Sequence, residues 1–421
     1  MRKIRNNFFS NDLIVTGIYF TMLFIGFLSI YSSQNTDGFD FLSFQNESFK
    51  QLIWILVCLF VFFSISILEY RFIFDLAVPL YCLSLFLLVL VLFVGQEVNS
   101  HSSWFNLFGF KFQPSEFSKF STALFLAKIF DSYSIDLKNI KHIFLTSIVF
   151  LLPSSIILLQ GDTGTALVYF SFFLVFLREG LSLNFLLFFF AFVIIFVLGL
   201  LVDAYILYIL ITVVFLVFVG LSIKDFRRVF NSFILFVLSV LIINGQGFVL
   251  NNVLTPKQKQ RVETLINPGS DPLGSGWNIT QSKIAIGSGG LFGKGFLKGT
   301  QTGLNFVPIQ STDFIFSVIG EEFGYLGSMI FIILYIIFLY RILILSEVQK
   351  DRFARVFGYS VFSIFLFHFT INVSMTLGLF PVIGIPLSLI SYGGSSLLSF
   401  SLLLFVFLKL NGVKSAILGR Q

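Results

Sequence analysis

Residues 73–94 read IFDLAVPLYCLSLFLLVLVLFV, an apolar run that carries a single charged side chain, Asp75. A helix of about 20 apolar residues spans the roughly 30 Å hydrocarbon core of a bilayer, because it rises about 1.5 Å per residue. A membrane strand needs only about 10 residues, and its apolar and polar positions alternate. This unbroken run therefore predicts a transmembrane helix and excludes a membrane strand.

Similar runs recur along the chain, which is 57% hydrophobic and only 11% charged, whereas soluble domains are about 25% charged. We therefore expect an all-α, polytopic integral membrane protein. It should form a single membrane domain over residues 1–421, with about twelve transmembrane helices. The expected spans are residues 13–32, 51–68, 73–94, 116–130, 143–160, 164–178, 183–202, 204–222, 229–246, 313–340, 356–378 and 387–409.

Lysine and arginine side chains predict the orientation of these spans, since short cytoplasmic loops carry an excess of them. With a cytoplasmic N-terminus, nearly all basic residues of the short loops fall inside, and Lys50 and Lys111 are the exceptions. An even number of spans then places both termini in the cytoplasm. The formal net charge of +6 is explained by this topology, and we expect no nucleic-acid partner.

Four connecting segments face outward in this topology, and they are residues 95–115, 161–162, 247–312 and 379–386. The longest, residues 247–312, is the main polar interruption of the chain, and we call it the outer loop. A chain this apolar has few other places for polar groups in a fixed geometry. The outer loop is therefore expected to be the catalytic segment, acting outside the cytoplasm without ATP.

Charged residues also stand within or beside the expected spans, and an ionisable group inside a span costs roughly 2.5–3.5 kcal/mol on insertion scales and usually faces the bundle interior. Glu116 and Lys119 stand at i, i+3 after Pro114, so they share one face of a helix that starts there. A local ion pair and a substrate contact both fit this spacing. Asp162 precedes Thr163, and either N-capping or a substrate contact fits it.

Asp313 opens the span at residues 313–340 and is expected either to cap it or to contact substrate. Glu321 and Glu322 lie roughly 12–14 Å below that helix start. Adjacent carboxylates at that depth need partners, water or protonation. A structural pairing with Lys119 is slightly favoured for them over a role in catalysis.

Asp271 is the strongest candidate for catalysis. It precedes Pro272, which favours an extended backbone, and Gly269, Gly274 and Gly276 permit tight turns or the close approach of a ligand. A partly desolvated carboxylate near a bilayer can act as a general base. The competing interpretation is an aspartate in an ordinary turn, which spacing alone favours.

The glycine-rich residues 287–295 resemble a phosphate-cradling loop but lack the P-loop pattern, because Lys294 is followed by Gly295 rather than Ser or Thr. Lys283 and Lys294 could still bind an anionic head group such as pyrophosphate, with contact to anionic lipid as the alternative. Ser395 fits a helix entrance, and a substrate contact is the second interpretation.

The sequence contains no arrangement typical of metal binding or of a Ser-His-Asp triad. Cys58 and Cys82 lie inside apolar runs, so neither a disulfide nor metal-ligand spacing is indicated. The three histidines are scattered along the chain. No cofactor is evident and no metal ligands are expected, while participation of a divalent cation stays open.

Five stretches in the same order resemble the SEDS (shape, elongation, division and sporulation) family across nearly the whole chain. They begin at Phe112 (FQPSEFSK), Gln160 (QGDTGT), Asp271 (DPLGSGWNITQSKIAIGSGG), Thr312 (TDFIFSVIGEE) and Pro386 (PLSLISYGGSS). Residues 299–306, GTQTGLNF, are more similar to the elongation branch than to the division branch. Members of the family usually have ten spans, so the resemblance implies a two-helix insertion within residues 179–246.

The resemblance implies a peptidoglycan glycosyltransferase that polymerises lipid II at the outer face of the bacterial cytoplasmic membrane, for cell elongation and shape. The family's catalytic aspartate matches Asp271, which would take the proton from the acceptor sugar hydroxyl while undecaprenyl pyrophosphate leaves the donor. Lys119 or Lys294 would stabilise the leaving group. The implied partners are a class B penicillin-binding protein, whose transpeptidase cross-links the new strands, and the membrane proteins of the elongation complex.

Two other functions are weighed against this one. A lipid-linked oligosaccharide flippase or transporter would use Lys119, Glu321 and Glu322 to line a path, and a non-catalytic scaffold would only support a transpeptidase. A transporter is expected to hold its best polar groups near the bilayer midplane, often between repeated halves. The chain shows no convincing internal repeat and its most polar segment lies outside the membrane, so the transferase is favoured.

Overall fold

The protein is described by a computed structural model, and the chain falls into two compact units. One unit comprises Met1–Gly180 and Asn278–Gln421, and the other comprises Leu181–Trp277. The structure describes residues 12–34, 43, 46–98, 101–107, 110–133, 135–182, 195, 198–199, 202–222, 226–248, 252, 255–266, 271, 274–304 and 306–418.

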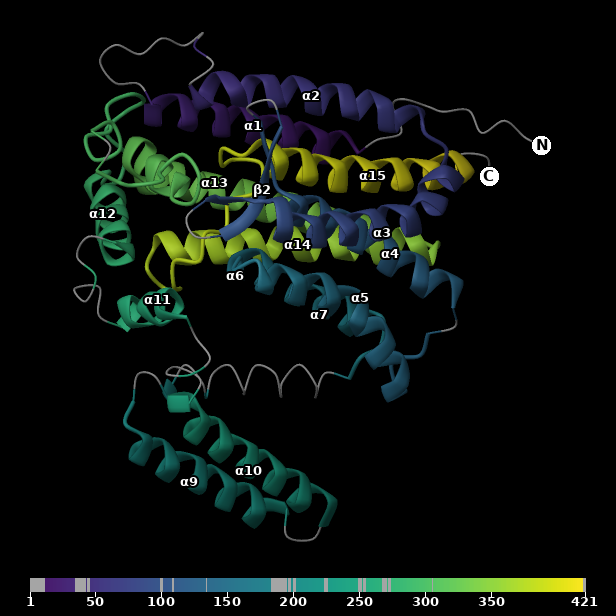
Figure 1. The fold of residues 1–421 in the computed structure, drawn as a ribbon, viewed down its shortest axis with the longest axis vertical. Coiled ribbons are helices and arrows are strands. Elements are labelled where there is room, and N and C mark those ends of the chain that lie inside the picture. The colour runs from purple at the N-terminus through teal and green to yellow at the C-terminus, as the bar shows by residue number, and fades with distance from the viewer. Residues whose placement is uncertain are drawn as a thin grey trace. The chain divides into compact units, whose positions relative to one another are not determined.

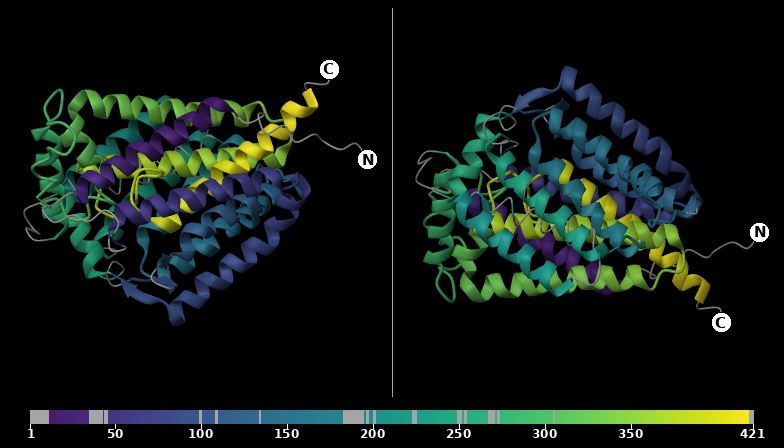
Figure 2. Two further views of the ribbon diagram at one scale, coloured as in Figure 1. Left: turned by 90° about the horizontal axis from the view of Figure 1, so that it is seen from above. Right: turned by 90° about the horizontal axis from the view of Figure 1, so that it is seen from below.

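The first unit is built from long helices that run side by side (Figures 1 and 2). Its helices are α1 (Leu13–Gln34), α2 (Glu47–Ile67), α3 (Tyr70–Val94), α4 (Pro114–Ser132), α5 (Ile140–Leu159), α6 (Thr163–Val168), α7 (Phe172–Arg178), α13 (Ile315–Glu347), α14 (Arg352–Thr376) and α15 (Gly394–Leu418). A short 3-10 turn, Tyr169–Ser171, separates α6 from α7. Helix α12 (Ser275–Ser288) crosses from the second unit into the first.

The predicted helical membrane fold is confirmed, although the chain also contains a small sheet and is therefore not strictly all-α. Among the described residues, eight helices are long and apolar enough to cross a membrane: α1, α2, α3, α5, α13, α14, α15 and residues 204–221. The chain is therefore a multi-pass membrane protein. The span expected at residues 183–202 lies almost wholly outside the described residues, and each of the other expected ranges overlaps a helix.

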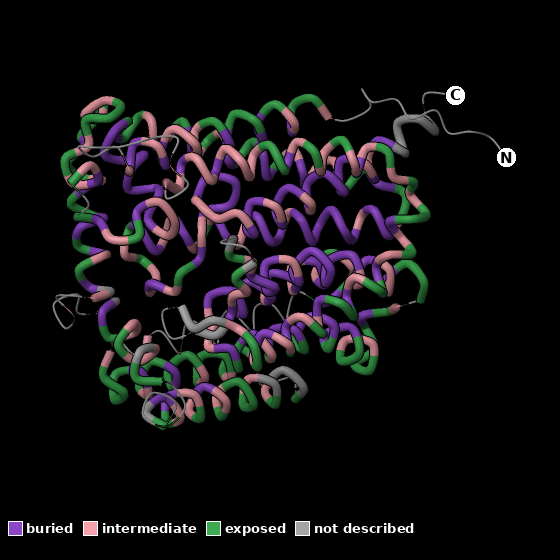
Figure 3. The backbone as a smooth tube through the Cα atoms, turned by 45° about the horizontal axis from the view of Figure 1, so that its top comes forward, coloured by how far each residue is buried: buried purple, intermediate pink, exposed green. Residues whose placement is uncertain are grey.

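Helix α4 packs against α3, α14 and α15, and most of its residues are buried. Figure 3 shows buried residues running along the inner helices of the first unit. The buried side chains of α4 include Ser115, Ser118, Ser121 and Thr122. Such small residues let neighbouring helix backbones approach closely inside a membrane. The hydroxyls of Ser118 and Ser121 donate to carbonyls of the preceding turn, so this polar helix is accommodated in an apolar bundle.

A small antiparallel sheet occupies the segment that was expected to be a loop at residues 95–115. Strands β1 (Gln96–Val98), β2 (His101–Leu107) and β3 (Phe110–Phe112) pair in that order. Aromatic residues favour strands, but strands this short give too weak an alternation to be recognised in the sequence. The third strand delivers the chain directly to the start of α4.

Helix α13 is broken at Gly324, whose φ is 67° and ψ is −162°. The glycine-rich residues 289–295 pack against this break, and the Gly295 N–H donates to the carbonyl oxygen of Glu322 at 2.9 Å. A Cβ atom on Gly293 would lie 2.0 Å from that same carbonyl oxygen, so glycine is required for the close approach. Packing of two backbones thus explains the glycine run that resembles a phosphate-binding loop.

The second unit contains a pair of packed helices, α9 (Ala204–Ser222) and α10 (Phe226–Phe248). Leu207 and Ile211 of α9 and Ile243 of α10 form its buried apolar cluster. Both helices were predicted as spans from their apolar runs.

The outer loop contains two helices that the apolar runs do not predict, α11 (Pro256–Ile266) and α12. A capping motif at the beginning of α11 indicates a helix, although the residues there show no apolar pattern. The side chain of Gln258 accepts from the Thr255 N–H at 3.0 Å, and the Thr255 hydroxyl accepts from the Gln258 N–H at 3.4 Å. This reciprocal capping box, with proline at the first helical position, favours a helix in a polar segment.

Candidate functional site

Residues 382–386 connect several of the predicted site segments at one end of the first unit, and we call them the hub segment. A Cβ atom on Gly164, two residues after Asp162, would lie 2.4 Å from the carbonyl oxygen of Ile383. The Asn372 amide donates to the Ile385 carbonyl oxygen and to the Asp313 carbonyl oxygen, each at 2.8 Å. The start of α6, the end of α14 and the start of α13 therefore meet at this segment.

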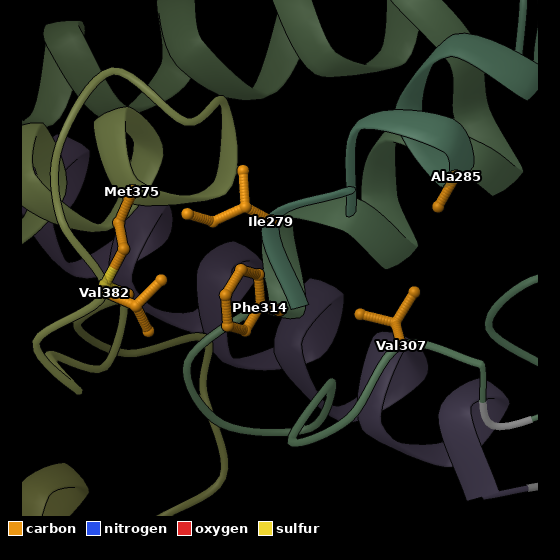
Figure 4. Close-up of a cluster of buried hydrophobic side chains, with 6 residues drawn as sticks. All are labelled: Ile279, Ala285, Val307, Phe314, Met375 and Val382. Carbon is orange, nitrogen blue, oxygen red and sulfur yellow. The ribbon is translucent and has the colours of Figure 1, made fainter. Parts of the chain in front are cut away.

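Apolar packing fixes α12 beside the hub segment (Figure 4). Ile279 and Ala285 of α12 belong to one buried cluster with Val307, Phe314, Met375 and Val382. Each of these six side chains is at most 9% exposed. The cluster joins the segment that follows Asp271 in sequence to α14 and to the hub segment.

A buried group contacts the hub segment through Pro386. It consists of Glu116, Lys119 and His368, and we call it the polar cluster. The Lys119 ammonium donates to both carboxylate oxygens of Glu116 at 2.9 Å and lies 3.0 Å from Nε2 of His368. His368 Nδ1 lies 3.0 Å from the carbonyl oxygen of Pro386. Because a carbonyl oxygen only accepts, Nδ1 carries the proton and Nε2 accepts from Lys119.

The polar cluster satisfies the groups that it buries. Lys119 is 0% exposed and Glu116 is 3% exposed, and the three N–H bonds of the ammonium have three acceptors. The Lys119 ammonium also lies 5.0 Å from the centre of the Phe400 ring, which favours the cation. The local ion pair expected from the i, i+3 spacing is confirmed, and its link to α14 through His368 was not predicted.

Asp162 caps α6, as its position before Thr163 predicted. One carboxylate oxygen accepts from the Thr165 N–H at 3.0 Å, and the other accepts from the Thr165 hydroxyl and from the Gln113 amide, each at 2.8 Å. The contact with Gln113 ties the start of α6 to the residue that precedes α4. Asp162 is only partly buried, so its carboxylate combines a structural role with partial exposure at the protein surface.

Asp313 does not cap α13, contrary to the expectation from its position. The N-cap residue is Phe314, and it makes no side-chain cap bond. The backbone carbonyl of Asp313 accepts a hydrogen bond from the Asn372 amide. The partly buried carboxylate of Asp313 lies beside Gly384. Ser395 is buried in the first turn of α15, 4% exposed, in agreement with the predicted helix entrance.

Glu321 does not pair with Lys119, so that expectation is wrong. Its carboxylate accepts from the Lys294 ammonium at 2.6 Å. It also accepts from the backbone N–H groups of Thr300, Gln301 and Thr302 at 2.8, 2.9 and 2.9 Å. Glu321 therefore clamps residues 294–302 onto the broken part of α13.

Glu322 continues this clamp. One of its carboxylate oxygens accepts from the Ser32 hydroxyl and, at 3.0 Å, from the Leu297 N–H. The side chain is 1% exposed. The two adjacent carboxylates thus find separate partners on a loop and on α1, and neither contacts Lys119.

Lys283 is an exposed side chain of α12 that lies over the C-terminal end of α14. A Cβ atom on Gly378 would stand 2.6 Å from the Lys283 ammonium. A cation is favoured at this end of a helix by the helix dipole. Lys283 thus adds positive charge to the end of the unit where Asp162 and Asp313 also lie.

Asp271 belongs to the second unit and stands four residues before α12 begins at Ser275. Its side chain is partly buried. Its two carboxylate oxygens lie close to the backbone of Gly274.

Two polar residues of this region, His368 and Asn372, were not singled out from the sequence. They stand one turn apart on α14, and both are almost fully buried, at 1% and 0% exposure. Polar side chains at i, i+4 within an apolar run indicate a face turned toward the bundle interior. That spacing was the available signal. Within the described ranges, no group of three or more His, Cys, Asp or Glu side chains is placed to hold a metal ion.

Comparison with known protein families places these residues in context. The family model of FtsW, RodA and SpoVE, described as cell cycle proteins, matches residues 12–206 and 184–415. Peptidoglycan glycosyltransferase RodA of Treponema pallidum (strain Nichols) is 36% identical over 407 residues, covering 89% of this chain and 91% of that protein. Peptidoglycan glycosyltransferase MrdB of Escherichia coli (strain K12) is 33% identical over 320 residues, covering 76% and 73%.

Solved structures give a similar fold. A chain from a study of the structural coordination of polymerization and crosslinking by a peptidoglycan synthase complex is 27% identical, with a TM-score of 0.72, covering 96% of this chain and 98% of that one. The crystal structure of Thermus thermophilus rod shape determining protein RodA is 25% identical, with a TM-score of 0.62 and the same coverage of 96% and 98%.

Proposed function

Because this chain belongs to the SEDS family of FtsW, RodA and SpoVE, we propose that it is a peptidoglycan glycosyltransferase of the RodA type. The observation that carries the proposal is the match to RodA of Treponema pallidum over 89% of this chain and 91% of that protein. Because the two chains match over nearly their whole lengths, the match includes the segments that carry the proposed site. The substrate is lipid II, and the product is a glycan strand for cell elongation and shape.

The proposed reaction is a glycosyl transfer with one general base. The Asp271 carboxylate takes the proton of the acceptor sugar hydroxyl, and the oxygen attacks the anomeric carbon of the donor. A new glycosidic C–O bond forms as the bond to the pyrophosphate breaks, and undecaprenyl pyrophosphate leaves with the electron pair. Pyrophosphate is a good leaving group, so a single base suffices and the configuration is inverted.

The first unit supplies groups suited to holding the substrate. Asp162, Asp313 and Lys283 lie near the hub segment and are at least partly accessible. Lys283 is the exposed cation of this group and would face the pyrophosphate. Further residues act around these three, and they are Glu116, Lys119, Lys294, Glu321, Glu322 and Ser395. All of them except Ser395 also fix the surrounding backbone through their contacts.

A flippase is less compatible with the contacts of the buried charges. A transport path needs polar groups that can exchange a protein partner for a passing substrate. The ammonium of Lys119 already has three acceptors, and the Glu321 carboxylate accepts from Lys294 and from three backbone N–H groups. Opening a path would break these buried contacts.

The proposed setting is the bacterial cytoplasmic membrane, with both termini in the cytoplasm and Asp271 on the outer side. Residues 179–246 include the two-helix insertion relative to ten-span members, and residues 247–312 include the catalytic segment. The partner is a class B penicillin-binding protein, and other elongation-complex membrane proteins join it. A structural relative comes from a complex that coordinates polymerization and crosslinking, which supports such a pairing.

The activity is tested with purified protein and lipid II. Products are separated on a gel in the presence of moenomycin, which suppresses unrelated transferases, and a ladder of glycan strands is expected. The same preparation in liposomes is assayed for movement of fluorescent lipid II between leaflets. Translocation without strands would support the flippase, and strands formed only by an added transpeptidase complex would support the scaffold.

A further inference from the structure

The structure shows an unusually close approach between the Asp271 carboxylate and the Gly274 backbone. A Cβ atom on Gly274 would lie 2.2 Å and 2.6 Å from the two carboxylate oxygens and 2.7 Å from the carboxylate carbon. Real Cβ atoms do not approach other heavy atoms at less than about 3.0 Å. The position of the carboxylate is therefore compatible only with a residue that has no side chain at 274.

The backbone does not by itself require glycine at this position. Gly274 is not among the residues with positive φ, so an alanine could adopt the same backbone conformation. The three atoms nearest to the added Cβ all belong to the Asp271 carboxylate. The absence of a side chain at Gly274 thus makes room for the Asp271 carboxylate.

An added methyl group would displace the carboxylate. Aspartate has a short side chain, so it escapes a contact of 2.2 Å only by turning about its Cα–Cβ bond. Such a turn moves the oxygens by more than an ångström. A general base must lie within hydrogen-bond reach, about 2.6–3.2 Å, of the proton that it removes.

We propose that Gly274 is a positioning residue, which leaves the space that the Asp271 carboxylate occupies when it faces the acceptor hydroxyl. This inference rests on the proposed function for the role of Asp271 in catalysis. The contact itself is independent of that role.

The experiment compares two glycine substitutions at opposite ends of α12. Gly274→Ala is expected to lower the turnover number for lipid II about 100-fold, as expected for displacement of a catalytic group by about 1 Å, with KM nearly unchanged. Gly287→Ala is the matched control, since an added Cβ there meets nothing within 4 Å. It should retain wild-type turnover. Wild-type turnover in Gly274→Ala would overturn the proposal.

A stability measurement keeps the inference testable if Gly274→Ala is poorly folded or if Asp271 proves not to be catalytic. Gly274→Ala is introduced into the wild-type chain and into the Asp271→Ala background, and thermal unfolding midpoints are compared in detergent. A drop in the wild-type chain that disappears in the Asp271→Ala background supports the contact. An equal drop in both backgrounds overturns it. Activity retained in Asp271→Ala alone would reject the proposed catalytic role and leave this comparison valid.

Discussion

The ammonium of Lys119 lies 3.0 Å from Nε2 of His368 and joins α4 to α14 among buried side chains of the first unit. Through Nδ1 of the same ring, the contact continues to the carbonyl oxygen of Pro386 at 3.0 Å. A buried charge on one helix is thereby connected to the hub segment. Any movement of α4 relative to α14 would require this chain of hydrogen bonds to break.

Replacing His368 with alanine is expected to destabilise the fold. One N–H bond of the buried Lys119 ammonium would lose its acceptor, which costs about 1–3 kcal/mol of unfolding free energy. The measurement is the unfolding midpoint in detergent. His142→Ala is the control, because that ring lies in an exposed loop contact, where a substitution is expected to change stability by less than about 0.5 kcal/mol. Equal effects of the two substitutions would mean that the polar cluster contributes no stability.

Glu321 and Lys294 are expected to be energetically coupled. The test is a double-mutant cycle of Glu321→Gln and Lys294→Met. The double variant should lose less unfolding free energy than the sum of the two single losses, by about 1–3 kcal/mol, as for contacting groups. The double variant avoids the unpaired charge that each single variant leaves. Lys298→Met is the control partner, since Lys298 is exposed on the same loop. Additive losses for Lys294 would argue against the clamp.

Asp162 has a capping role and a proposed substrate contact, and two substitutions separate them. Asp162→Ala removes the acceptor for the Thr165 N–H and should cost about 1 kcal/mol of stability. Asp162→Asn retains an oxygen for the cap but loses the second oxygen, which accepts from the Thr165 hydroxyl and the Gln113 amide, so it should lose less stability than Asp162→Ala. If the charge also contacts substrate, Asp162→Asn raises KM for lipid II at a temperature where the variant is still fully folded. An unchanged KM would restrict Asp162 to capping.

The apolar runs predicted the helices well because burial in lipid requires a long, continuous signal. The span expected at residues 73–94 corresponds to α3 at Tyr70–Val94. The apolar pattern missed β1 to β3 and α11, which lie between the expected spans and depend on short aromatic strands and on capping by Thr255 and Gln258.

Local spacing predicted local contacts in the site but not distant partners. The Glu116–Lys119 ion pair and the Asp162 cap follow from separations of three residues. The partners of Glu321 were assigned wrongly, because Lys294 and Lys119 are equally plausible cations in the sequence and only the fold brings Lys294 within 2.6 Å. His368 was missed for the same reason, as it lies 249 residues from Lys119.

The proposed membrane orientation is tested by cysteine labelling. Cys58 and Cys82 are first replaced with serine, and single cysteines are introduced at two exposed lysines, Lys298 and Lys138. A membrane-impermeant maleimide should label Lys298→Cys in intact spheroplasts. Lys138→Cys should react only after lysis, because its loop is expected in the cytoplasm. The reverse pattern would invert the topology and remove Asp271 from the side where strands are made.

Polymerisation of lipid II by purified Asp271→Ala is the decisive measurement, read as glycan strands on a gel beside the wild type. Loss of the general base should abolish the strands, while the unfolding midpoint and co-purification with a class B penicillin-binding protein stay at wild-type levels. A normal ladder of strands from Asp271→Ala would show that this carboxylate does not perform the transfer.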